Sequence, residues 1–207
     1  AHVAGVPLKG IVTCIRHFGP EKARETAKCA AETASDWIVG FGMGGAEDVG
    51  RATDFAYAFD IAREAGLRLT SHAGEWGGSQ SVWETVNDLK VERIGHGVHS
   101  INDLNLVRYL AETGIVLEVN PGSNVALGVF NSFAEHPIAK LRDAGVKVTV
   151  STDDPPFFHT TMTREFEELE RAFGWGSDDF KRLNQTALEA AFCDATTKEI
   201  ISKRLDT

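Results

Sequence analysis

The chain has 207 residues, which is enough for one sizeable domain around a single hydrophobic core. Its formal net charge is −9, with 21 Lys and Arg against 30 Asp and Glu, and without a basic run we do not expect a nucleic-acid-binding face. No apolar stretch reaches the roughly 18 residues that a membrane span needs, so no membrane partner is expected. The three cysteines form an odd count without CxxC spacing, which favours a reducing, cytoplasmic compartment over a disulfide framework.

Apolar runs alternate with helical patterns along the chain. The runs that read as strands are residues 9–17, 37–41, 67–71, 93–97, 115–119 and 146–150. The helical patterns are residues 21–33, 50–65, 82–89, 100–113, 136–144, 162–173, 178–192 and 196–204. The helix at 100–113 opens on a sequence that resembles a capping box, Ser100 to Asp103, and stops at Gly114. This alternation predicts a parallel sheet with crossover helices.

Two α/β architectures fit six βα units, an open doubly wound sheet and part of a closed barrel. Polar or glycine-rich residues follow nearly every strand instead of gathering at one switch point, which favours the barrel. A closed eight-stranded barrel takes about 250 residues, so this chain is short by about two units. We therefore expect a single partial TIM-type (β/α)8 barrel domain over residues 1–207, with C-terminal helices at 162–204.

Metal-ligating and acidic side chains stand at the ends of several predicted strands. Because parallel strands point their carboxyl ends to one rim, these side chains should meet there. Catalytic zinc takes about three protein ligands from His, Asp or Glu and ionises bound water near neutral pH. His72 and Asp153 are ligand candidates, and Glu75 is a candidate general acid. His96, between two glycines, could orient water or stabilise developing charge.

Each of these side chains also has an ordinary structural explanation. A strand-end His is more often a hydrogen-bonded structural residue than a ligand, and Asp153-Asp154-Pro155-Pro156 could be a simple turn. The glycines at 42–45 match neither dinucleotide nor P-loop spacing. His99 is expected to be structural. The set points to function because all its members map to the same rim.

Three segments in order resemble the motifs of one family, the metal-dependent adenosine deaminases of the amidohydrolase superfamily. They are His72-Ala73-Gly74-Glu75, residues 93–97 and residues 151–155, with weaker matches at 43–47 and 121–124. The resemblance runs from about residue 9 to the C-terminus. It implies a zinc-dependent hydrolytic deamination of adenosine to inosine and ammonia, in which zinc-bound hydroxide attacks C6 of the purine.

The resemblance also assigns roles to particular residues. It implies His72 and Asp153 as zinc ligands, Glu75 as the proton donor to purine N1, and His96 as the side chain that assists the attacking water. The second Asp of the last motif would contact the purine, and the glycine after the fourth barrel strand would lend its N–H to purine N3. These two substrate-binding positions are Asp154 and Gly45.

The family also uses a His-x-His pair as two zinc ligands, and this chain has none; the nearest segment is His2-Val3-Ala4. The chain thus resembles a deaminase without its first two βα units. We expect it to bind zinc poorly and to deaminate weakly or not at all on its own. Open edges at residues 11–16 and 146–150 are expected to promote self-association or pairing with the missing N-terminal segment.

The sequence also allows other functions. An adenine deaminase of the same family would share the chemistry and differ in ribose recognition. A non-catalytic, deaminase-like scaffold is possible, although His72, Glu75, His96 and Asp153 are all present. An unrelated amidohydrolase would more often use a carboxylated Lys or a second metal.

Overall fold

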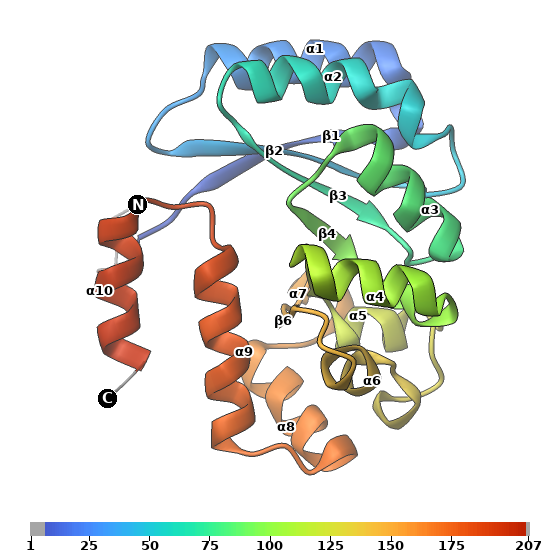
Figure 1. Cartoon of the computed structure of the whole chain (residues 1–207), viewed down its shortest axis with the longest axis vertical. Coiled ribbons are helices and arrows are strands. Elements are labelled where there is room, and N and C mark those ends of the chain that lie inside the picture. Colours follow the sequence, from blue (N-terminus) through green and yellow to red (C-terminus); the bar gives the residue numbers. More distant parts are fainter. Residues whose placement is uncertain (1–6, 206–207) are drawn as a thin grey trace.

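The structure is a computed structural model that describes residues 7–205. Its six strands form one parallel sheet in which each strand lies beside its neighbours in the sequence (Figure 1). The strands are β1 (Gly10–Ile15), β2 (Ile38–Gly44), β3 (Arg68–Ala73), β4 (Arg93–His96), β5 (Val116–Val119) and β6 (Val148–Val150). The segment His2-Val3-Ala4 lies outside the described residues.

The strand order decides between the two architectures that the sequence left open. A doubly wound sheet reverses its order at a switch point, whereas β1 to β6 follow one another without a reversal. This is the order of a barrel wall, so the prediction of a partial TIM-type barrel is confirmed. Within residues 7–205, β1 pairs only with β2 and β6 only with β5, and both sheet edges are open.

Helices follow the strands and cover the sheet. Helices α1 and α2 lie side by side over β1 and β2, and α9 packs against both β6 and α10 (Figure 1). The helices are α1 (Gly19–Glu32), α2 (Ala52–Glu64), α3 (Gly78–Glu84), α4 (Leu104–Thr113), α5 (Pro121–Ala126), α6 (Ile138–Asp143), α7 (Pro155–Phe158), α8 (Met162–Phe173), α9 (Ser177–Ala190) and α10 (Ala195–Leu205). Short 3-10 or π turns occupy 16–18, 85–89, 98–102 and 133–135.

The hydrophobic core lies between the sheet and these helices. Phe41 of β2 and Phe59 of α2 meet edge to face with ring centroids 5.2 Å apart. Ile94, Leu106 and Leu117 are fully buried and belong to the same core cluster. Burial of side chains of this size contributes about 1.5–3 kcal/mol each to the stability of the fold.

The start of α4 differs from the prediction. Residues 98–102 form a 3-10 turn, and α4 begins at Leu104. The side chain that caps it is Asp103, which accepts hydrogen bonds from two backbone N–H groups of the first turn. Ser100 is buried in the preceding turn and makes no such cap. The capping residue is therefore the last member of the predicted box, three positions later than expected.

Two strands extend beyond their predicted ends. β2 continues to Gly44, and β3 continues to Ala73, so His72 lies inside the strand instead of after it. Residues 121–126, which are not among the predicted helices, form α5. A search of residues 7–205 finds no helix with the length and apolar character that a bilayer crossing requires.

Candidate active site

His72 and His96 project from neighbouring strands at their carboxyl ends. The parallel register pairs His72 with Gly95 and Ala73 with His96. The two imidazole rings meet edge to face with centroids 4.7 Å apart. A Cβ atom at Gly95 would lie 2.5 Å from Cδ2 of His72, so the glycine before His96 is required by the neighbouring imidazole.

Glu75 lies on the turn after β3 and faces His96. Its Oε2 is 3.5 Å from His96 Nε2, and ligand atoms of His72, Glu75 and His96 all lie within 4.8 Å of one another. Burial, with the charges of Asp153 and Glu47, raises the pKa of Glu75 to about 7. Oε1 of Glu75 is buried and has no hydrogen-bond partner among the described residues. Burying a polar atom without a partner costs free energy, so Oε1 is a candidate for contact with a bound ligand.

Asp153 approaches the same group from the turn after β6. Its Oδ2 lies 3.9 Å from His96 Nε2 and accepts a hydrogen bond of 2.8 Å from the Ser123 hydroxyl. Asp153 and His96 both have left-handed backbone, with φ of 55° and 63°. Non-glycine residues rarely adopt this conformation, and such strain is concentrated at functional sites.

His96 is enclosed by polar side chains as well as by the core. Only 1% of it is exposed, and burial, with the nearby rings of His72 and His136, lowers the pKa of His96 to about 3. Its Nδ1 lies 3.2 Å from Nδ2 of Asn124 and 3.5 Å from Nδ2 of Asn120. The His96 ring is therefore neutral, and the two Asn side chains contact it at Nδ1.

The turn that carries Glu75 is held by a second carboxylate. Glu47, three residues after β2, is buried and accepts hydrogen bonds from the backbone N–H groups of residues 74–77 and from the Ser81 hydroxyl. Burial by itself would raise the pKa of Glu47, but these hydrogen bonds outweigh it and the pKa lies below its ordinary value. Glu47 is thus an ionised anchor for this turn.

The two positions predicted to bind the substrate lie at the same end of the sheet but are exposed. Gly45 follows β2 with a φ of 96°, and a Cβ there would lie 2.9 Å from Nδ1 of His17. Asp154 is exposed and precedes α7, where its carbonyl accepts hydrogen bonds from Phe157 and Phe158. His99 is structural, since its ring and its N–H both bond to the carbonyl of Gly74.

The sequence did not predict a role for four polar residues that contact the site residues or one another, namely Glu47, Ser123, Asn124 and His136. Glu47, Ser123 and Asn124 lie in the two segments that matched the family weakly, which was the available signal. No sequence signal marked His136, because a His before a proline is typical of the start of a helix. Their contacts join residues from different βα units.

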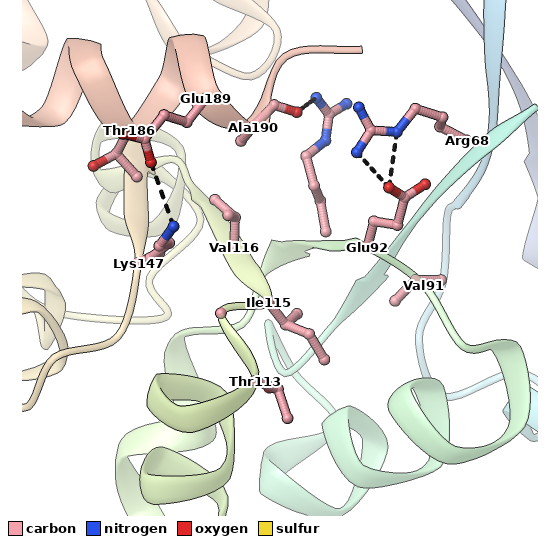
Figure 2. A pocket seen from close by; sticks show the side chains of 12 residues that line it. Arg68, Val91, Glu92, Thr113, Ile115, Val116, Lys147, Thr186, Glu189 and Ala190 are labelled. Atoms are coloured by element: carbon pink, nitrogen blue, oxygen red, sulfur yellow. Dashed lines mark hydrogen bonds and ion pairs between the residues drawn. The ribbon is translucent and has the colours of Figure 1, made fainter.

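A cavity of about 370 Å³ lies at the opposite end of the strands, where α9 passes over the starts of β3 to β6 (Figure 2). Its cations are all paired: Arg68 with Glu92, Arg93 with Glu118 and the Ala190 carbonyl, and Lys147 with Glu189. It therefore offers no unpaired cation to an anionic ligand and is separate from the His72, Glu75 and His96 group.

The donor atoms at the strand ends suit a divalent metal. Ligand atoms of His72, Glu75 and His96 lie within 4.8 Å of one another, and Oδ2 of Asp153 lies 3.9 Å from Nε2 of His96. Imidazole nitrogen and carboxylate oxygen are the ligand atoms that zinc takes in hydrolytic enzymes. Oε1 of Glu75 is one of these oxygens, and it has no hydrogen-bond partner among the described residues. The residues present fit part of the ligand set of a zinc ion.

Comparison with known proteins identifies the family of this chain. The model of the family described as adenosine deaminase matches residues 1–207. An adenine deaminase of Rhizobium rhizogenes is 52% identical over 202 residues, which cover 98% of this chain and 63% of the relative. An adenine deaminase of Rhizobium johnstonii is 50% identical with the same coverage. This chain thus spans less than two thirds of the length of these relatives.

Solved structures share the fold. The adenine deaminase from Arthrobacter aurescens superposes with a TM-score of 0.92 at 28% identity, over 98% of this chain and 62% of that one. A zinc-bound amidohydrolase from Burkholderia ambifaria gives 0.90 at 28% identity, over 98% and 57%. The N6-methyl-AMP deaminase from Arabidopsis thaliana gives 0.86 at 26% identity, over 96% and 58%. The chain belongs to the adenosine deaminase family.

Proposed function

We propose that the complete protein hydrolyses the 6-amino group of adenine, so that adenine and water give hypoxanthine and ammonia. The observation that carries this proposal is the convergence of His72, Glu75, His96 and Asp153 at one end of the sheet. The choice of adenine over adenosine, which the sequence analysis put first, follows the relatives at about 50% identity that are named adenine deaminases.

Zinc would be held by His72 and Asp153 and would supply the Lewis acidity that activates water at neutral pH. Glu75 donates a proton to purine N1, since a pKa of about 7 leaves much of this carboxyl group protonated near neutral pH. His96 faces the oxygen that adds to C6. Asp154 and the N–H of Gly45 bind the purine ring, and both lie exposed at the same rim.

The substrate is tested by assaying adenine and adenosine side by side with the full-length, zinc-loaded protein. Release of ammonia and the absorbance change of the purine both report the reaction. Turnover of adenine with a kcat/KM at least tenfold above that for adenosine supports the proposal. A preference for adenosine would support the adenosine deamination that the sequence analysis predicts. No turnover of either purine would favour a non-catalytic scaffold.

Zinc binding by these 207 residues alone should be weak. Catalytic zinc takes about three protein ligands, whereas His72 and Asp153 provide two. We propose that further ligands come from outside this sequence. Titration of the 207-residue chain with zinc should show no tight one-to-one binding and little deaminase activity, and the full-length protein is the control. Tight binding with full turnover in the short chain would overturn this.

The open edges at β1 and β6 suggest a structural partner. Among residues 7–205 each edge strand pairs on one side only and carries apolar side chains, which tends to recruit further strands. We propose that a segment outside these residues closes the barrel, and that the 207-residue chain self-associates without it. Sedimentation should then show oligomers of the short chain; a monodisperse monomer would contradict this. Free Cys14, Cys29 and Cys193 fit a cytoplasmic location.

A further inference from the structure

Behind His96 lies a chain of buried polar groups that begins at a backbone amide. The N–H of Ile138, at the start of α6, donates to Nδ1 of His136 at 3.2 Å. Nε2 of His136 lies 3.2 Å from Oδ1 of Asn124, and Nδ2 of Asn124 lies 3.2 Å from Nδ1 of His96. His136 is 2% exposed and Asn124 is fully buried, so neither can exchange these partners for water.

The direction of every hydrogen bond in this chain follows from its first member. A backbone N–H can only donate, so Nδ1 of His136 accepts and the single proton of this neutral ring sits on Nε2. That proton points at Asn124, which must present its carbonyl oxygen there and its NH2 group to His96. Nδ1 of His96 then accepts, and the ring carries its proton on Nε2.

Nε2 is the atom of His96 that faces the reaction site. It lies 3.5 Å from Oε2 of Glu75 and 3.9 Å from Oδ2 of Asp153. Asn120 also points its NH2 group at Nδ1 from 3.5 Å, which favours the same proton position. In the opposite tautomer, the N–H at Nδ1 of His96 would face the NH2 group of Asn124. Nε2 would then offer only a lone pair to the reaction site.

We propose that Asn124 and His136 are positioning residues that fix His96 as the Nε2–H tautomer, so that it donates a hydrogen bond to the oxygen that adds to the substrate. This rests on the proposed function only for the identity of that oxygen. The hydrogen-bond direction itself is a property of this chain. An aligned donor of this kind stabilises developing negative charge without reorganisation during the reaction.

A purely structural role for the same residues makes a different prediction. If Asn124 only filled space, then an isosteric change would alter stability and leave the tautomer of His96 as it was. Asn124→Asp keeps the shape but replaces the NH2 donor by an oxygen acceptor. Nδ1 of His96 would then have to carry a proton.

The test uses the full-length, zinc-loaded protein with 15N-labelled histidine. Long-range 1H–15N spectra separate protonated from unprotonated ring nitrogens, and comparison with His96→Gln assigns the signals. In the wild type we expect His96 to be protonated on Nε2 alone. In Asn124→Asp we expect a proton on Nδ1, and kcat for adenine lower by about 100-fold with KM changed less than about threefold.

Asn131→Asp is the matched control, because Asn131 is exposed and bonds only to Glu135 among the described residues. It should leave the His96 signals and kcat unchanged. If Asn124→Asp fails to fold, His136→Phe replaces it: without the Nε2–H donor, Asn124 loses its orientation and mixed tautomers should appear.

The two proposals can fail separately. A wild-type His96 with its proton on Nδ1 overturns this inference whether or not adenine is hydrolysed. A wild type with the Nε2–H tautomer but no purine deamination leaves the hydrogen-bond chain established and overturns the proposed function. Unchanged kcat in a folded Asn124→Asp enzyme also overturns the inference.

Discussion

The Glu75 carboxyl group combines burial with an oxygen that no described group bonds, and its pKa of about 7 suits a proton donor. Glu75→Gln keeps the shape and removes the transferable proton. We expect kcat for adenine to fall by about 100- to 10,000-fold with zinc content unchanged, measured by steady-state kinetics and metal analysis. Glu84→Gln, on α3 and bonded to Arg51, is the control and should behave as wild type. A loss of less than about tenfold in Glu75→Gln would contradict this role.

Gly95 makes room for a ring on the neighbouring strand. A Cβ there would lie 2.5 Å from Cδ2 and 3.2 Å from Nε2 of His72, so Gly95→Ala should displace that imidazole. We expect the zinc dissociation constant of the full-length protein to rise by about 10- to 100-fold, measured by competition with a chelator. Gly176→Ala meets no atom within 4 Å and should have no effect. Equal zinc affinity in the two variants would remove His72 from the ligand set.

At the scale of elements, the turn between β3 and α3 is anchored to the residue that follows β2. Glu47 accepts hydrogen bonds of 3.0 Å from Glu75 N–H, 2.7 Å from Trp76 N–H and 3.0 Å from Gly77 N–H. A turn held at four successive amides keeps the acid in one orientation, and a displacement of about 1 Å costs on the order of 100-fold in rate.

Glu47→Gln should therefore lower kcat by about 100-fold and speed amide hydrogen exchange at residues 74–77. Glu92→Gln is the matched control, because Glu92 also bonds β3, through Arg68, but at the opposite end of the strand. Both variants should lose stability, and only Glu47→Gln should lose rate. If both keep wild-type kcat while exchange rises in Glu47→Gln, the anchor is structural and not catalytic.

At the scale of the whole molecule, a buried neutral His136 links folding to pH. Burial lowers the pKa of His136 from 6.5 to about 3. Between these two pH values His136 is protonated in the unfolded chain and neutral in the folded chain. Its contribution to stability is complete above pH 6.5 and is lost as the pH falls toward 3, by up to about 1.4 kcal/mol per pH unit.

Urea unfolding of the wild type should thus show a steep loss of stability between pH 6.5 and pH 4.5, and His136→Gln should reduce that slope. His17→Gln, at an exposed position, is the control and should keep the slope of the wild type. Parallel pH profiles for wild type and His136→Gln would show that other groups govern acid unfolding.

Much of this protein could be read from its sequence because the signals are local. The βα rhythm, the helix at 162–173 and the motif that ends in Glu75 each depend on residues within a few positions of one another. Errors arose where neighbours compete locally, as when Asp103 and not Ser100 capped α4. The predicted strand at 67–71 stops two residues before the end of β3, because strand ends depend on pairing with the next strand.

Only the tertiary structure decided which distant groups meet. Sheet order and register bring Glu47 onto the turn of Glu75, and they bring Asn124 and His136 behind His96. These contacts join different βα units, whose relative placement depends on strand pairing and core packing across the whole sheet. A sequence can therefore name the reacting side chains, while the groups that orient them are determined by the fold.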